Sequence, residues 1–224
     1  MTVSVHITNL QQLEKVSLRE RVSRALRAAI VSGELEPGEV YSAPALGAKF
    51  GVSATPVREA MLDLVRENLV TTVPNKGYRI TTVGEADLDD ITELRMLIEP
   101  PLAAKVTAEI PAEDMPKLRD LARAIVDGAL AGDLVAYTDA DHAFHLQLLA
   151  YVGNARVSAL IADLRAHTRL YGLSSLDGSE LEESAREHDL ILDAIEANDP
   201  QEVERLMQAH ISQTRGRWAR PEGS

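Results

Sequence analysis

Four residues in the second half of the chain have the types and the spacing of a metal site. Asp141 and His145 are four positions apart in a segment with helical periodicity, so both side chains point to one face of that helix. His188 and His210 lie midway along two later helical segments, each among apolar positions. One carboxylate and three imidazoles are suitable ligands for zinc, nickel or manganese, and positions would remain open for water or a chelating ligand.

An ordinary structural reading competes with this one. Polar residues four apart usually lie on a solvated helix face, and a lone buried histidine is more often hydrogen-bonded than bound to metal. His142 adjoins the pair but points about 100° away from Asp141 on a helix, so it is not included. The metal hypothesis therefore requires a fold that brings four distant side chains to one point.

The composition favours packed helices. The chain has 224 residues, 45% of them hydrophobic, 4% aromatic and none of them cysteine. Disulfides and thiolate metal sites are therefore excluded. No apolar run approaches the roughly 20 residues of a membrane span, and the first twelve residues lack the features of a secretory signal. These observations predict a soluble cytoplasmic protein with no membrane partner.

The charge is distributed unevenly. The formal net charge is −12, which at first argues against nucleic acid as a partner. Residues 1–82, however, carry ten Lys and Arg against eight Asp and Glu, whereas residues 83–224 carry thirteen against twenty-seven. This asymmetry indicates two parts with different partners.

The two parts also differ in their predicted elements. The first has helical segments at 18–32 and 44–50, a third helix beginning at Thr55-Pro56, and strands at 70–73 and 78–82 joined by a tight turn. This order is typical of a winged helix-turn-helix. The second part contains only helical segments, at 85–109, 111–131, 133–152, 154–172, 180–197 and 200–218.

The resulting fold class is mainly α. Short connections make consecutive helices antiparallel, so we expect a six-helix bundle over residues 84–220 after a winged-helix domain over residues 1–83. Pro100-Pro101 should kink or split the first helix of the bundle.

The third helix and the turn between the strands carry the candidate DNA contacts. Arg58 lies near the start of the helix, where side chains reach base edges in the major groove. Ser53 and Thr55 stand at its entrance, where hydroxyls and backbone N–H groups meet phosphate, and Thr55 can cap it. Lys76 and Gly77 form the tip of the wing, and Gly77 permits close approach to the DNA backbone or minor groove. The alternative is that these are ordinary solvated positions.

The motif FGVSATPVREAM, followed by LVTTVPNKGYRI, resembles the GntR family of bacterial regulators. The resemblance implies that the first part binds a double-stranded DNA operator and that Arg58 contacts it. The sequence departs from the family pattern at Pro44 and Ala54, where members often have arginine. We therefore expect DNA binding but derive no operator sequence.

The second part resembles the FCD effector domain of the FadR branch of that family, through the segments TELRMLIE, DADHAFHLQLL, EHDLILDAIEAND and AHI. The resemblance implies that the Asp and three His named above bind a divalent metal beneath an organic acid. It also implies that Arg95 reaches the acid's carboxylate, although Arg95 and Glu99 could instead form an exposed ion pair. Asn154 and Arg169 are further effector-pocket candidates.

Three functions follow from these features. The first is a homodimeric repressor that reads a near-palindromic operator and is controlled by a small organic or sugar acid. In the second, the metal itself is the signal. The third is a metal-dependent enzyme. Two observations argue against it: no further acidic residue is evidently placed as a general base, and an enzyme would leave the winged helix unexplained.

Overall fold

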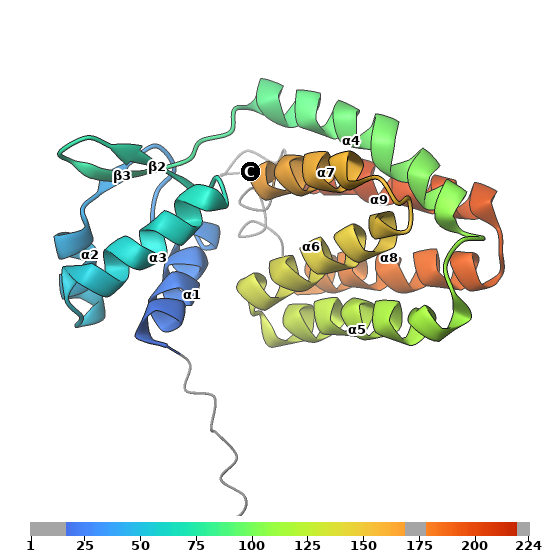
Figure 1. Ribbon diagram of the computed structural model, residues 1–224, viewed down its shortest axis with the longest axis horizontal. Helices are drawn as coiled ribbons and strands as arrows, with labels where there is room; N and C mark the ends of the chain where they lie inside the picture. The colour runs from blue at the N-terminus through green and yellow to red at the C-terminus, as the bar shows by residue number, and fades with distance from the viewer. Residues whose placement is uncertain (1–16, 169–177, 219–224) are drawn as a thin grey trace, which may run out of the picture.

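The computed structural model describes residues 17–168 and 178–218, which form a winged-helix unit beside a larger helical bundle (Figure 1). The winged-helix unit takes the blue and teal part of the chain, and the bundle takes the part from green to red. The mainly helical fold expected from the sequence is confirmed. Within the described residues, no helix combines the length and the apolar character that crossing a membrane requires.

The winged-helix unit is built from three helices and a small sheet. Its elements are α1 (Leu18–Val31), β1 (Val40–Tyr41), α2 (Ala43–Phe50), α3 (Ala54–Arg66), β2 (Val70–Val73) and β3 (Gly77–Ile80). A capping box of Ser17 and Glu20 begins α1, and Gly51 ends α2 with φ of 67°. Leu26, Met61 and Ile80 are fully buried between the helices and the sheet. This core fixes α3 against the hairpin.

The sheet contains one strand that the sequence did not predict. Its order is β1-β3-β2 and both pairings are antiparallel, with Tyr41 opposite Tyr78 and Val70 opposite Ile80. The β1 strand has two residues, which is too short for an alternating pattern to be recognised. Its pairing with β3 anchors the hairpin to the segment that leads into α2.

The expected start of α3 was wrong. Ser53 is the N-cap residue, so Thr55 and Pro56 are already inside the first turn rather than at the cap and first position. Pro56 costs no helical hydrogen bond there, because the first N–H groups of a helix have no partner within it. The Ser53 side chain makes no capping hydrogen bond, and both Ser53 and Thr55 are exposed at the helix entrance.

We expect Gly77→Ala to destabilise the winged-helix unit. Gly77 has φ of +140°, and a Cβ there would overlap the carbonyl oxygen of Tyr41 and lie 2.9 Å from its carbonyl carbon. The backbone conformation alone costs roughly 1–3 kcal/mol for a residue with a side chain. Thermal unfolding measures the loss, and Gly178→Ala is the control because a Cβ at Gly178 meets nothing within 4 Å. Equal unfolding temperatures for the two variants would contradict the prediction.

The bundle consists of α4 (Glu85–Val106), a 3-10 turn η1 (Ala112–Asp114), α5 (Met115–Ala131), α6 (Leu134–Ala150), α7 (Ala155–Thr168), α8 (Gly178–Glu196) and α9 (Pro200–Trp218). Helix α5 packs against α6 and α8, and α9 packs against α4 and α8 (Figure 1). Gly128 allows the close approach of α5 to α6, since a Cβ would lie 2.7 Å from the backbone nitrogen of Tyr137. Phe144, Leu148 and Ile191 are fully buried in the shared core. The arrangement places α6, α8 and α9 around one interior.

Of the kink or split expected at Pro100-Pro101, the split was wrong. Helix α4 continues through both prolines. Their nitrogens cannot donate to the carbonyls of Met96 and Leu97, but Leu97 is 66% exposed, so water can reach this side of the helix. Helix α4 also packs against α9, which supports it through the prolines.

The two units contact each other through α1 and the end of α3. Arg24 pairs with Asp133 at 2.6 Å, and Arg27 lies 4.0 Å from a carboxylate oxygen of Asp139 on α6. Asn68, just after α3, donates to Asp163 on α7 at 3.0 Å. Val31, the last residue of α1, is buried in the core of the bundle. The helices α6 and α7 therefore carry the contacts to the winged-helix unit.

Candidate metal centre

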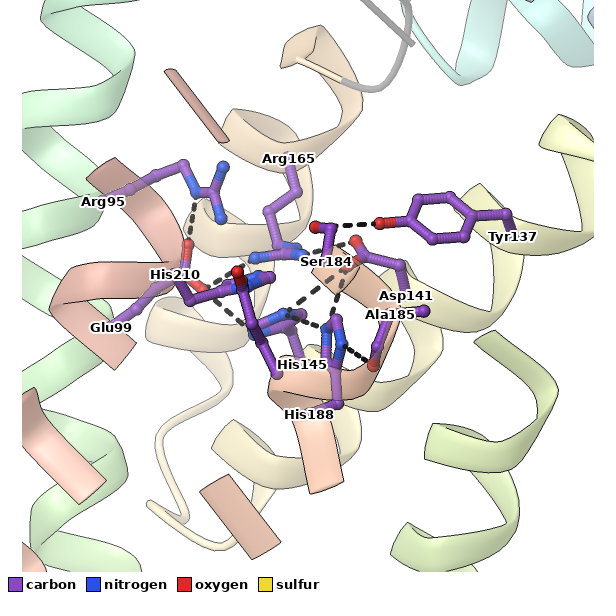
Figure 2. A network of polar contacts seen from close by, with 11 residues as sticks. Arg95, Glu99, Tyr137, Asp141, His145, Arg165, Ser184, Ala185, His188 and His210 are labelled. Atoms are coloured by element: carbon purple, nitrogen blue, oxygen red, sulfur yellow. Dashed lines mark hydrogen bonds and ion pairs between the residues drawn. The ribbon is translucent and has the colours of Figure 1, made fainter. Parts of the chain in front are cut away.

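The four candidate metal ligands meet inside the bundle. Asp141 and His145 project from α6, His188 from α8 and His210 from α9, and one ligand atom from each lies within 4.8 Å of the other three (Figure 2). The Nε2 atom of His188 is 3.2 Å from both His145 Nε2 and Asp141 Oδ1. The three histidines are at most 3% exposed. The alternative that these side chains lie on solvated faces was therefore wrong.

Two of the histidines have outer nitrogens with well-placed acceptors. His188 Nδ1 is 3.0 Å from the carbonyl oxygen of Ala185, and His210 Nδ1 is 2.7 Å from Oε2 of Glu187. A ring whose Nδ1–H is donated outward offers the lone pair of Nε2 inward. This is the arrangement that a metal-binding histidine requires.

The electrostatics of the cluster favour the protonation states that bind metal. Burial alone raises the pKa of Asp141, but Arg165 and the neighbouring histidines outweigh it and hold this pKa well below its ordinary value. Burial, and then the charge of Arg165, lowers the pKa of His145 far below the usual range. Burial also lowers the pKa of His210, although the contact with Glu187 opposes this. An ionised carboxylate and neutral imidazoles are the forms that coordinate metal ions.

A buried ion-pair network adjoins the cluster. Arg95 Nε donates to Glu99 Oε1 at 2.5 Å, and Arg165 donates to Glu99 Oε2 at 2.9 Å and to Asp141 Oδ2 at 2.5 Å (Figure 2). His145 Nδ1 lies 3.5 Å from Glu99 Oε2. Arg95 forms the expected pair with Glu99, but the pair is buried rather than exposed. The two guanidinium groups are therefore buried beside the candidate ligands.

The sequence prediction missed Arg165 and chose Arg169 and Asn154 in its place. The sequence signal for Arg165 was its spacing from an apolar residue. It lies four positions after Ile161, which is fully buried, so the two side chains share one helix face. Arg169 lies outside the described residues. Asn154 is exposed at the start of α7, where its side chain accepts a hydrogen bond from the backbone of Arg156. The structure gives Asn154 a helix-capping role instead of a place at the cluster.

Three of the candidate DNA contacts lie together on one face of the winged-helix unit. Ser53, Thr55 and Arg58 are exposed on the first turns of α3, and Lys76 is exposed in the turn of the hairpin. Arg58, Lys76 and Gly77 line one cleft of about 460 Å³ between α3 and the hairpin. Gly77 itself is half-buried against the backbone of β1, where a Cβ would overlap the carbonyl oxygen of Tyr41, so packing by itself requires glycine at this position.

Comparison with known proteins identifies the class. Residues 18–80 match the family "Bacterial regulatory proteins, gntR family", and residues 90–213 match the FCD domain family. The chain belongs to the GntR family, with an N-terminal DNA-binding domain and a C-terminal FCD domain, and it is a transcriptional regulator rather than an enzyme.

Its relatives include the HTH-type transcriptional regulator McbR of Escherichia coli (strain K12), which is 27% identical over 84% of this chain and 86% of the relative. The HTH-type transcriptional repressor GlaR of the same organism is 28% identical over 84% of this chain and 90% of the relative. The solved structure of E. coli McbR/YncC covers 89% of this chain and 95% of its own, with 25% identity and a TM-score of 0.66.

Proposed function

We propose that this regulator is a homodimeric repressor whose operator binding is controlled by a small organic or sugar acid held at a divalent metal ion. Residues 1–83 would bind DNA, and residues 84–220 would bind the metal and the acid and would dimerise. The observation that carries the proposal is the convergence of one carboxylate and three buried imidazoles next to two buried arginines. The name of GlaR as a repressor supports the direction of control.

The ligand set fits zinc, nickel or manganese. Nitrogen ligands with one carboxylate suit these ions, and four protein ligands leave coordination positions for oxygen atoms of an acid. When bound, the metal would supply positive charge that attracts those oxygens. Asp141, His145, His188 and His210 would hold it.

The charge balance of the site supports an anionic effector. Without metal, the guanidinium groups of Arg95 and Arg165 are balanced by the carboxylates of Glu99 and Asp141. A divalent cation would leave this buried site with excess positive charge, which is costly unless an anion compensates. A carboxylate would compensate it and could accept bidentate hydrogen bonds from an arginine.

The contacts between the two units suggest how binding at the site reaches the DNA. Asp139 lies two residues before the ligand Asp141, and Asp163 lies two residues before Arg165. These two aspartates face Arg27 and Asn68 of the winged-helix unit. Any movement of α6 or α7 on binding the acid would therefore alter the docking of the winged helix, and different docking would change its affinity for DNA.

Operator binding is expected to weaken about 5- to 150-fold in Arg58→Ala, because a specific arginine–base contact is worth about 1–3 kcal/mol. Lys76→Ala should instead weaken binding to all DNA sequences and reduce the salt slope by about one. Fluorescence anisotropy with the promoter region of the chain's own gene, at several salt concentrations, measures both effects. Arg123→Ala is the control, because it removes the same charge from the surface of α5. Unchanged affinity in both DNA-face variants would contradict this assignment.

The effector is tested by thermal shift. Metal-loaded and metal-free protein are screened with organic and sugar acids, since a ligand specific for the folded state raises its stability by mass action. The proposal requires an acid that stabilises only the metal-loaded protein and also changes operator affinity. If metal alone changes operator affinity and no acid has an effect, the metal is the signal.

A further inference from the structure

Glu187 connects two of the candidate metal ligands without being one of them. It precedes His188 on α8, yet its side chain reaches across to α9, where Oε2 lies 2.7 Å from Nδ1 of His210. The Glu187 side chain is 18% exposed, whereas that of His210 is 4% exposed. Of these two neighbouring residues of α8, His188 thus lies in the cluster itself, and Glu187 lies behind the ligand His210.

We propose that Glu187 is a positioning residue for metal binding, a role that rests on the proposed function of the cluster. By accepting the Nδ1–H of His210, its carboxylate fixes the orientation of the imidazole and keeps the hydrogen on Nδ1. The Nε2 lone pair is then directed at the metal, and the negative charge behind the ring makes that nitrogen a stronger donor. A carboxylate behind a histidine ligand commonly contributes 10- to 100-fold in metal affinity.

The surroundings make Glu187 the best acceptor with which to test such a role. The acceptor for His188 is the carbonyl of Ala185, which mutation cannot remove. The carboxylate near His145 belongs to Glu99, and its replacement would also remove an ion-pair partner from two buried arginines. Glu187 is partly exposed, so water can fill the space that a smaller side chain leaves.

The experiment compares wild type, Glu187→Gln, Glu187→Ala and the control Glu182→Gln, which removes the same charge from the same helix at a surface pair with Arg186. Zn²⁺, Ni²⁺ and Mn²⁺ affinities are measured by competition with a chelating dye. We expect binding to weaken about 10- to 100-fold in Glu187→Ala, less in Glu187→Gln because its amide oxygen still accepts a hydrogen bond, and not in Glu182→Gln.

A second readout separates positioning from general destabilisation. Imidazole ¹⁵N–¹H spectra of the metal-free proteins report which ring nitrogen of His210 carries the hydrogen. We expect the Nδ1–H form alone in wild type and Glu187→Gln, and a mixture of both forms in Glu187→Ala. If wild type binds metal and Glu187→Ala either binds it equally well or shows an unchanged spectrum, the inference is wrong. Failure of wild type to bind any of these metals would overturn the proposed function as well.

Discussion

His188→Ala is expected to abolish metal binding, with little effect on the basal affinity for DNA. His188 lies between two other ligands, since its Nε2 is 3.2 Å from both His145 Nε2 and Asp141 Oδ1. Its removal deletes one of the four ligand atoms that converge in this buried site. Asp141→Ala should have the same effect, because the carboxylate supplies the negative charge among the ligands.

Two measurements test this prediction. Elemental analysis gives the metal content, and thermal unfolding with added metal gives the stabilisation. For wild type, metal at 100 times its dissociation constant should add about 2.7 kcal/mol to the free energy of unfolding, and for both variants the gain should be close to zero. His167→Ala is the control, because His167 lies outside the cluster on α7 and its ring contacts the carbonyl of Asp163. Full metal content in both variants would disprove the ligand assignment.

Glu99→Gln is expected to lower the free energy of unfolding of the metal-free bundle by about 3–5 kcal/mol. Glu99 is fully buried and accepts hydrogen bonds from both Arg95 and Arg165. Burial alone raises the pKa of Glu99, but the two arginines outweigh it and hold the pKa below its ordinary value, so the carboxylate is ionised. A neutral amide would leave two buried guanidinium groups to share the charge of Asp141.

Urea unfolding followed by circular dichroism measures this loss. The control is Glu182→Gln, which breaks an i,i+4 pair with Arg186 of the same spacing as the Arg95–Glu99 pair, but on the surface. Exposed helix pairs of this kind contribute about 0.3–0.5 kcal/mol. Comparable losses in the two variants would mean that the buried network contributes no more than a surface pair.

The convergence of the four candidate ligands follows the resemblance to the FCD domain, because helical spacing and residue type alone left a solvated face as an alternative. Asp141 and His145 had to share a helix face, and a bundle of short-looped helices gave His188 and His210 an interior to meet in. Similarly, the predicted helix ends at residues 50 and 131 coincide with those of α2 and α5, since Gly51 and Gly132 follow them with positive φ.

Other features depend on distances between helices, which periodicity does not contain. Arg165 and Arg169 look alike in a sequence, and only the packing of α7 against α4 and α6 brings Arg165 to both Glu99 and Asp141. The helix is not split at Pro100-Pro101, because packing of α4 against α9 overrides the low helix propensity of proline. The short β1 strand is defined by its partner β3 and not by its own composition.

The burial of Val31 limits how the DNA-binding half can be separated from the rest. This side chain belongs to α1, yet it is covered by residues of the bundle. In a fragment cut after residue 83, Val31 would be exposed to water at the end of α1. The fragment would lose the roughly 1.5–3 kcal/mol of stabilisation that burial of an aliphatic side chain provides. A chimera that joins this winged-helix unit to the effector domain of another protein would therefore need apolar residues in that domain to cover Val31.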